Sequence, residues 1–389
     1  MKNDYLIIPH GRKLQNLMID DTEERKKLVE ELKESPKIKL STLEFSDLVM
    51  LGIGAFSPLE GFMTESDYRS VLENMGLSNG TLWPLPITLT VGDKDKYKVG
   101  DKVALISPYS DETVGQIEIE DIYSYDKDRE ALASFGTVDR AHPGVAKLKS
   151  LGSYHIGGKV KVFSEGRYPK TFHEYARPSE TRDIFKQKGW ESIIAFQTRN
   201  PMHRSHEYLT KVVLETFDGL FIHPIVGRLK KGDISAEVRM ACYQVLLDNY
   251  YPKDRVVLKV YPMEMRYGGP REAILHAIIR QNYGATHIII GRDHAGVGDF
   301  YGPFDAQDIF DTIEDEDLAI KPVKMDWTFY CKKCKSMASF KTCPHPKEDH
   351  IMISGTKLRE MLSRGQYPPE YVTRKEVSDI LINYYKEYG

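Results

Sequence analysis

The sequence predicts an α/β protein, because strand and helix patterns alternate through its central part. Four short apolar runs there are strand candidates, at 192–196, 220–226, 255–260 and 287–290. Helical periodicity follows each of the first three runs, and this alternation is typical of a parallel, doubly wound sheet. Short strand patterns precede this part, and a segment with clustered cysteines follows it. We therefore predict three domains, at residues 1–168, 169–326 and 327–389.

The N-terminal part begins with a charged helical segment, residues 21–34, and continues as short β-branched runs separated by turn signals. The runs lie at 83–91, 102–106 and 114–119. They predict a small β-barrel. The Gly-rich stretch 51–63 is similar to a nucleotide-binding loop, but Ser57 stands where the third Gly of that motif belongs. We interpret this stretch as a tight structural turn.

The helices of the central part have recognisable ends. The first continues through Phe217, the second runs from a candidate N-cap at Ser235 to about Asn249, and the third starts near Pro270. Pro in the first turn and Gly284 after the last turn are the usual start and stop signals of a helix.

The densest polar stretch, residues 196–207, connects the first strand to the first helix. It carries an amide, a hydroxyl, two guanidinium groups, an Asn and two imidazoles. His203 and His206 are three residues apart, so they share a helix face. A strand that leads into a helix N-terminus with so many donors predicts an anion site.

Three further polar loops follow the other strands, at 226–233, 263–272 and 291–302. Because the strands are expected to be parallel, all four loops should lie at one edge of the sheet, where ligands bind in such folds. Their glycines let a ligand approach the backbone, and their Arg and His residues supply charge-assisted donors. The sequence therefore predicts one site assembled from four loops.

The residue types in these loops favour a transfer reaction without a covalent intermediate. The sequence has no G-x-x-x-x-G-K-[ST] phosphate loop, no clustered Asp pair for two metal ions and no nucleophile elbow. Donors and positive charge suit a reaction in which the protein positions two anions and stabilises an in-line transition state. Nucleotidyl transfer fits: an acceptor oxyanion attacks the α-phosphorus of ATP, and pyrophosphate leaves.

The C-terminal part contains a candidate zinc site. Cys331 and Cys334 form a C-x-x-C pair, Cys343 follows, and His345 and His350 lie just beyond it. Three thiolates and one His make a closed, structural tetrahedral set. We select His350 as the fourth ligand, because His345 lies only two residues from Cys343. The alternatives are a redox C-x-x-C or unrelated thiols.

Two more segments complete the chain. Ile353-Ser354-Gly355-Thr356 leads into a basic helical pattern, which is a weak phosphate signal on its own. An amphipathic helix is expected at 376–385.

The composition excludes several classes of protein. The 389 residues carry a formal net charge of −3, which argues against a general nucleic-acid-binding surface. The N-terminus does not resemble a signal peptide, and no window reaches the roughly 18 apolar residues of a membrane span. Four cysteines do not make a disulfide framework, so we expect a cytoplasmic protein with no membrane or nucleic-acid partner.

Three motifs closely resemble those of the ATP sulfurylase (sulfate adenylyltransferase) family. They are Gln197-Thr198-Arg199-Asn200-Pro201 with His203-Arg204-Ser205-His206, Met265-Arg266-Tyr267 with Gly269-Pro270-Arg271-Glu272-Ala273, and Gly291-Arg292-Asp293-His294-Ala295-Gly296. The resemblance covers nearly the whole chain. It implies a PUA-like β-barrel domain, a Rossmann-like nucleotidyltransferase domain and a small C-terminal α/β domain with a zinc knuckle, as in a bacterial and archaeal branch.

The resemblance also implies the reaction and its participants. ATP and sulfate would give adenylyl sulfate (APS) and pyrophosphate, with magnesium bound to ATP and a structural zinc, and the reverse direction could make ATP. We expect a homodimer and no kinase domain after Gly389.

The site roles that the resemblance implies are specific to each residue. Sulfate contacts are expected from Gln197, Arg199 and the backbone N–H of Ala295, and catalysis from Thr198, Arg199 and Asn200. The residues expected to bind ATP are Gln197, Asn200, His203, His206, Gly291, Arg292 and His294.

Two other hypotheses stay open from the sequence. One is a different H-x-x-H nucleotidyltransferase with another anionic acceptor. The other is a non-enzymatic RNA-binding protein that uses the barrel and the zinc knuckle. Zinc bound by His203 and His206 is a further alternative, although the motif places no third ligand.

Overall fold

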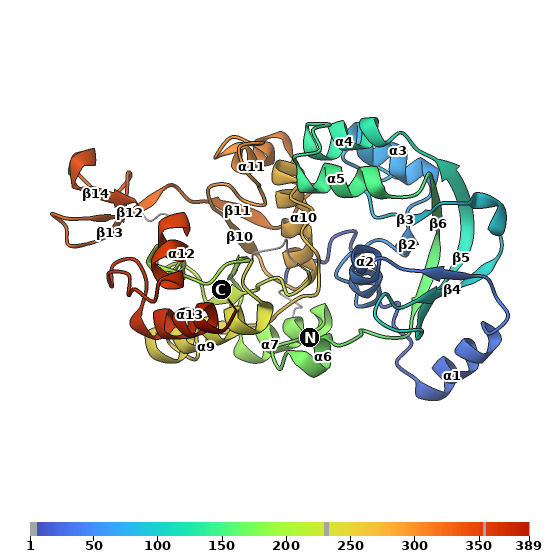
Figure 1. The fold of residues 1–389 in the computed structure, drawn as a ribbon, viewed down its shortest axis with the longest axis horizontal. Helices are drawn as coiled ribbons and strands as arrows, with labels where there is room; N and C mark the ends of the chain where they lie inside the picture. Colours follow the sequence, from blue (N-terminus) through green and yellow to red (C-terminus); the bar gives the residue numbers. More distant parts are fainter. Residues whose placement is uncertain (1–5, 229–232, 353–354, 389) are drawn as a thin grey trace.

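A computed structural model describes residues 6–228, 233–352 and 355–388. The β-rich N-terminal part lies at one end of the molecule, a parallel sheet with its helices lies in the middle, and a small three-stranded sheet lies at the other end (Figure 1).

The N-terminal part contains a six-stranded mixed sheet and five α-helices. Its strands are β1 (Lys37–Lys39), β2 (Gly61–Phe62), β3 (Leu89–Val91), β4 (Lys102–Ile106), β5 (Thr113–Ser124) and β6 (Tyr154–Val162), in the order β1-β4-β5-β6-β2 with β3 also on β6. Its helices are α1 (Thr22–Glu31), α2 (Thr42–Gly52), α3 (Glu65–Asn74), α4 (Lys127–Phe135) and α5 (Pro143–Ser150), with a 3₁₀ turn, η1 (Lys94–Lys96). β4 and β5 form an antiparallel hairpin, and β5 also pairs antiparallel with β6, although α4 and α5 lie between these two strands in the chain.

The prediction for this part was right about β4 and incomplete elsewhere. β4 occupies the predicted 102–106, but only the last three residues of the 83–91 run form a strand. The sequence did not predict α2, because nine of its eleven residues are buried and its apolar residues show no one-sided periodicity.

The central part contains five parallel strands. These are β7 (Ile193–Phe196), β8 (Gly219–Ile222), β9 (Val256–Leu258), β10 (His287–Ile290) and β11 (Lys321–Lys324), in the order β11-β10-β7-β8-β9. All four pairs are parallel, so the strands end at one edge. The order reverses between β7 and β10, where open parallel sheets form a ligand crevice.

The connections confirm the predicted alternation of strand and helix. The helices are α6 (Tyr168–Thr171), α7 (Pro178–Lys188), α8 (Arg204–Leu214), α9 (Ala236–Tyr250), α10 (Gly269–Asn282) and α11 (Asp305–Asp308), followed by η2 (Ile309–Thr312). The sequence prediction missed β11, which contains Pro322. Pro cannot donate to a central ladder, and β11 tolerates it because it is an edge strand.

The C-terminal part is a three-stranded antiparallel sheet with two helices. It consists of β12 (Thr328–Cys331), β13 (Ser336–Ser339), η3 (Lys347–Asp349), β14 (His350–Met352), α12 (Gly355–Ser363) and α13 (Lys375–Tyr388). The predicted amphipathic helix 376–385 lies within α13, which packs on α9 of the central part.

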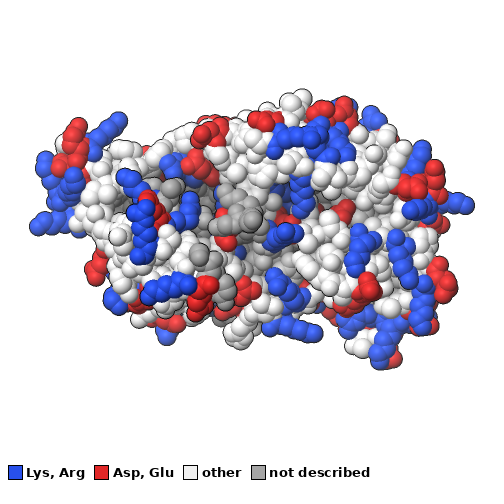
Figure 2. Space-filling view, viewed as in Figure 1, with Lys and Arg blue, Asp and Glu red and all other residues white. Residues whose placement is uncertain are grey.

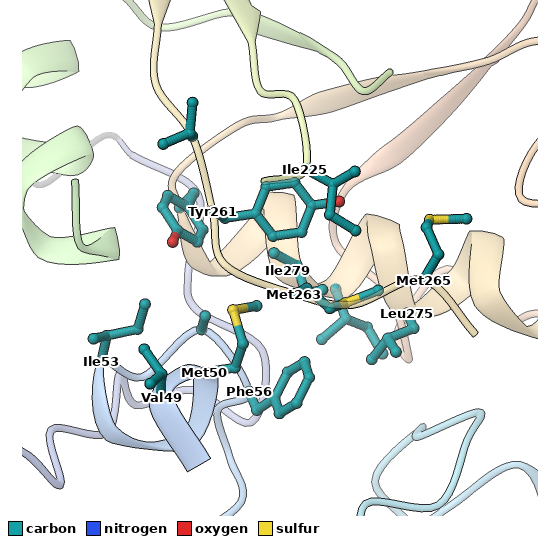
Figure 3. Close-up of a cluster of buried hydrophobic side chains, with 14 of the residues drawn as sticks. Val49, Met50, Ile53, Phe56, Ile225, Tyr261, Met263, Met265, Leu275 and Ile279 are labelled. Carbon is teal, nitrogen blue, oxygen red and sulfur yellow. The ribbon is translucent and has the colours of Figure 1, made fainter. Parts of the chain in front are cut away.

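One continuous apolar core joins the N-terminal and central parts. Figure 3 shows side chains of α2 and its following turn facing α10 and the segment after β9. The residues labelled there are Val49, Met50, Ile53, Phe56, Ile225, Tyr261, Met263, Met265, Leu275 and Ile279. The turn that follows α2 also accepts hydrogen bonds from Asn282 Nδ2 at the carbonyls of Ala55 and Ser57, which supports a structural role for the Gly-rich stretch.

A buried ion pair crosses the same interface. Arg266 Nη2 lies 2.6 and 2.7 Å from the two carboxylate oxygens of Asp47, and both side chains are almost fully buried. The pair fixes the segment between β9 and α10 against α2. Neighbouring Lys147 binds Glu264 of the same segment at 3.1 Å.

The surface carries charges of both signs. Basic and acidic side chains are interspersed on the face in Figure 2, in keeping with the net charge of −3. Among the described residues, no helix combines the length and apolarity that a membrane crossing requires.

Asp47→Ala should strongly destabilise the protein, because it leaves the Arg266 guanidinium buried without its counter-ion. Breaking such a pair typically costs about 3–5 kcal/mol. Asp111→Ala is the control, since Asp111 forms an exposed pair with Lys39 and should change stability by less than about 0.5 kcal/mol. Urea denaturation followed by fluorescence measures both variants, and equal midpoints would show that the buried pair does not hold the interface.

Candidate functional site

One cavity of about 590 Å³ lies at the carboxyl edge of the parallel sheet. The loops after β7, β10 and β11 supply most of its wall, which is the position expected for a switch-point crevice. Every residue predicted to bind sulfate or ATP, or to act in catalysis, lines it: Gln197, Thr198, Arg199, Asn200, His203, His206, Gly291, Arg292, His294 and Ala295. The structure therefore brings these residues together around one cavity.

The loop after β7 is shaped by the Thr198 hydroxyl. This hydroxyl donates to the carbonyl of Asn200 and accepts the N–H of Asn200, both at 3.1 Å. Tyr243 also donates to the Asn200 carbonyl, at 2.7 Å. Because the Thr198 hydroxyl is used in this turn, it is held as a structural group and has no base beside it in these contacts.

Arg199 and Gln197 each have a buried polar atom without a partner in the described part of the chain. Arg199 donates from Nη2 to the Gly296 carbonyl at 3.2 Å, while Nη1 is unpaired. Gln197 Oε1 is also unpaired, and its Nε2 has only the Met265 sulfur, 4.0 Å away. If the Gln197 side-chain amide is flipped, only this weak contact with sulfur is lost, and the NH₂ group takes the place of the unpaired oxygen as a donor. Buried polar groups are almost always satisfied, so these atoms indicate a ligand position.

His203 and His206 are stacked neutral imidazoles at the start of α8. Their ring centroids lie 3.9 Å apart, and His206 also packs on Phe196. Burial lowers the pKa of His206 to about 4, and burial and the neighbouring ring lower the pKa of His203 well below its ordinary value. The backbone N–H of His203 donates to the ring atom Nδ1 of His206 at 3.4 Å. Because Nδ1 accepts this hydrogen bond, the ring proton of His206 is on Nε2. His206 is therefore a neutral hydrogen-bond donor.

The loop after β10 holds a charged and aromatic wall. Arg292 lies over the Trp327 ring, with 3.9 Å between the guanidinium carbon and the ring centroid, and pairs with Asp293 at 2.9 Å. Asp293 and Ala295 have positive φ values of 53° and 56°. Asp tolerates positive φ better than most residues, whereas Ala adopts it only at a cost, and such strain collects at binding sites.

Several residues of the site were not predicted from the sequence. Met265 and Trp327 line the cavity, and the Tyr267 ring lies under Arg199, with 5.0 Å between guanidinium carbon and centroid. Met265 and Tyr267 belong to a motif that the sequence singled out, so only their position was missing. Trp327 follows β11, and recognising that strand would have placed it at the same edge.

Glu207 was a second omission. It accepts hydrogen bonds from Arg204, Lys211 and Arg374 at 2.8–3.0 Å. Burial alone raises its pKa, but the bonds from Arg374 and Lys211 outweigh burial and lower the pKa to about 2. Glu207 thereby ties the start of α8, which carries the two histidines, to the C-terminal part.

The cysteine cluster places a different histidine beside the three thiols than the one predicted. The ligand atoms of Cys331, Cys334, Cys343 and His345 all lie within 4.8 Å of one another. His345 Nδ1 is 3.4, 3.2 and 3.7 Å from the three sulfurs, in that order, and Cys334 Sγ lies 3.7 Å from Cys343 Sγ. The structure therefore assembles His345, and not the predicted His350, with the three thiols.

The short spacing between Cys343 and His345 does not prevent this arrangement. Nδ1 lies close to the main chain, so a residue two positions after Cys343 can still turn it toward the sulfurs. His350 stacks on Phe329, with centroids 3.7 Å apart, and its Nε2 lies 3.5 Å from Cys343 Sγ. His203 and His206 do not belong to any group of metal-binding side chains found among the described residues.

Two predicted loop segments fall partly outside the described residues. Residues 229–232 of the loop after β8, and Ile353 and Ser354 of the phosphate-like turn, are among them. Gly355 at the start of α12 does line the cavity.

Two family models and several known proteins are similar to this chain. A model of the ATP-sulfurylase family matches residues 173–384, and a model of a PUA-like domain matches residues 7–165. A sulfate adenylyltransferase from Desulforamulus reducens is 51% identical over 385 residues, which is 98% of each chain. One from Pelodictyon phaeoclathratiforme is 50% identical, over 98% of this chain and 95% of its own.

A solved structure has a similar overall fold. It is described as a hexameric APS kinase from Thiobacillus denitrificans and superposes with a TM-score of 0.75 at 25% identity. The match covers 97% of this chain and 68% of that one. With the family match over more than half its length and relatives near 50% identity over almost all of it, this chain belongs to the ATP-sulfurylase family.

Proposed function

We propose that the protein is a sulfate adenylyltransferase, which converts ATP and sulfate to APS and pyrophosphate. Relatives of that name match 98% of the chain at about 50% identity. The observation that carries the proposal is that Arg199, Gln197 and His203 line one cavity and that each has a buried polar atom without a partner among the described residues. A tetrahedral dianion and a triphosphate offer the acceptors that such atoms need.

The chemistry explains why the site contains donors and no obvious base. A sulfate oxygen forms a bond to the α-phosphorus of ATP, and the bond from that phosphorus to the bridging oxygen breaks. Sulfate attacks as a dianion and pyrophosphate leaves as an anion, so no proton has to be removed or supplied. Neutral imidazoles and guanidinium groups are then sufficient, because the barrier is lowered by alignment and by charge stabilisation.

The two anions are assigned to different parts of the cavity. Gln197, Arg199 and the backbone N–H of Ala295 would hold sulfate. Asn200, His203, His206 and the loop with Gly291, Arg292 and His294 would hold ATP. His206 Nε2–H is suited to the pyrophosphate oxygens, since it donates without adding a proton to the leaving group. Thr198 would act by keeping the loop between the anions in shape.

Magnesium would enter with ATP. Among the described residues that line the cavity, two carry carboxylates, Asp293 and Asp326, and Asp293 is paired with Arg292. Such a site suits Mg²⁺ held mainly by phosphate oxygens and water. Magnesium would neutralise charge on the phosphates.

The cysteine cluster would bind a structural zinc. Tetrahedral Zn–S bonds of about 2.3 Å place two sulfurs about 3.8 Å apart, close to the 3.7 Å between Cys334 and Cys343. None of the four ligands is among the residues that line the cavity. However, β12 and β14 carry Thr328 and Met352 into its wall, so the metal would stabilise that wall.

Further details stay proposals. The strand order β11-β10-β7-β8-β9 supports a Rossmann-like nucleotidyltransferase domain at 169–326, and the mixed sheet supports a PUA-like barrel at 1–168. Residues 327–389 would be a third domain. A homodimer, a cytoplasmic location and a possible physiological role in the reverse direction rest on the family resemblance.

The protein incubated with ATP, magnesium, sulfate and a pyrophosphatase should release phosphate only when sulfate is present, and molybdate should replace sulfate. Arg199→Ala should lower kcat/KM by about 10²–10³-fold, because it removes a buried donor to the reacting anions. Lys253→Ala, an exposed change in the same domain, is the control and should be active. Release with an organic phosphate acceptor but not with sulfate would favour the second class of nucleotidyltransferase.

Elemental analysis of the purified protein should give about one zinc per chain. His345→Ala should lose most of the zinc, whereas the neighbouring His350→Ala should retain it, because only His345 lies near all three sulfurs. The reverse result would restore His350 as the ligand, and zinc loss in neither variant would exclude both.

A further inference from the structure

A chain of buried ionisable groups runs from inside α10 to the cavity. His294, on the cavity wall, places Nε2 at 3.1 Å from Nδ1 of His276. The other ring nitrogen of His276, Nε2, lies 3.5 Å from Oε1 of Glu272, a charge contact that lacks hydrogen-bond geometry. Glu272 and His276 are fully buried. The proposed reaction does not use Glu272 or His276, so another reason is needed for placing these ionisable side chains in the protein interior.

Glu272 is held as a carboxylate at the inner end. Oε1 accepts the N–H of Arg266, and Oε2 accepts the N–H of Gly268, both at 2.9 Å. Burial raises the pKa of this carboxyl, but the His276 ring and the two N–H groups outweigh burial and lower the pKa below its ordinary value. A negative charge therefore faces His276 Nε2.

Both imidazoles are neutral. Burial lowers the pKa of His276, although Glu272 partly opposes it. Burial, followed by the His276 ring and the guanidinium groups of Arg280 and Arg199, lowers the pKa of His294 well below its ordinary value. A neutral imidazole has one N–H and one bare nitrogen, so each contact in the chain constrains the next.

The charge on Glu272 determines which nitrogen of His276 is protonated, and His276 in turn determines which nitrogen of His294 is protonated. The carboxylate favours the proton of His276 on Nε2, which leaves Nδ1 bare. A bare Nδ1 at 3.1 Å requires a donor, so the proton of His294 must be on Nε2. Nδ1 of His294 is then the bare nitrogen.

We propose that Glu272 and His276 are positioning residues that hold His294 in the Nε2–H tautomer, so that His294 offers a ligand a hydrogen-bond acceptor. An acceptor repels phosphate and sulfate oxygens, which have no protons. His294 therefore contacts a hydroxyl or amine donor, which in ATP means the nucleoside. This last assignment rests on the proposed function, whereas the tautomer does not.

The tautomer is measured by NMR on protein labelled with ¹⁵N in its 12 histidines, in the absence of substrates. A His294→Gln spectrum identifies the His294 signals. At neutral pH the wild type should show a protonated Nε2 and a bare Nδ1 for His294. A protonated Nδ1, or a positively charged ring, would overturn the proposal whether or not the protein makes APS.

Variants of the inner groups test the direction of control. Glu272→Gln removes the charge and His276→Leu removes the acceptor, so each should give His294 a mixture of tautomers. His276→Asn can place an amide carbonyl near the former Nδ1 and should restore the Nε2–H form. Ile279→Val is the control, because it lies buried on the same helix and has no ionisable group. An unchanged tautomer in folded Glu272→Gln and His276→Leu would refute the positioning role.

Kinetics then test the nucleoside contact. His276→Leu should raise the KM for ATP about tenfold, the effect of one lost hydrogen bond, and leave the KM for sulfate within about twofold. His276→Asn should recover most of the loss. Equal increases in both KM values would contradict a contact with the nucleoside, even if the NMR result stands.

Discussion

Parallel pairing of β7 with both β8 and β10 is the constraint on which the site depends. β7 and β10 end side by side at the point where the strand order reverses, so Gln197 to Asn200 and Gly291 to Ala295 meet although they are far apart in the chain. A change of register or order would separate them. The buried Asp47–Arg266 pair completes this frame, because it holds the segment that places Met265 beside Gln197 and Tyr267 under Arg199.

Within this frame, the protein holds its imidazoles neutral and its positive charge on arginines. The low pKa of His206 keeps its Nε2–H a donor, and the contacts of Glu272 and His276 assign His294 the opposite function, that of an acceptor. The two histidines therefore discriminate between parts of one substrate. Donors are appropriate for phosphate oxygens, and an acceptor is appropriate for a nucleoside hydroxyl or amine.

The sequence was sufficient for the central fold and for the composition of the cavity. Apolar runs and helix signals located β7 to β10, and parallel strands require their following loops to share an edge. The sequence did not predict α2 or β11, and each omission has a physical reason. α2 is buried all round and has no periodic face, and β11 contains a Pro that only its edge position tolerates.

Other features needed side-chain geometry. His345 was rejected because of its short spacing to Cys343, but the distance from backbone to Nδ1 is short enough to close the cluster. Glu272 and His276 lie in a helix where almost every residue is buried, so spacing alone could not distinguish them from core. Only the side-chain contacts from Glu272 to His276 and from His276 to His294 indicate a function for these two residues.

In the proposed reaction, the site transfers the adenylyl group directly from ATP to sulfate, by alignment and charge stabilisation. Stereochemistry at the α-phosphorus measures this, with ATP made chiral at that atom and the configuration determined in APS. One in-line attack by sulfate inverts the configuration, and inversion is the expected result. Retention would mean two displacements through a covalent adenylyl-enzyme, and would contradict a site in which the Thr198 hydroxyl is committed to its own turn and the imidazoles serve only as hydrogen-bonding groups.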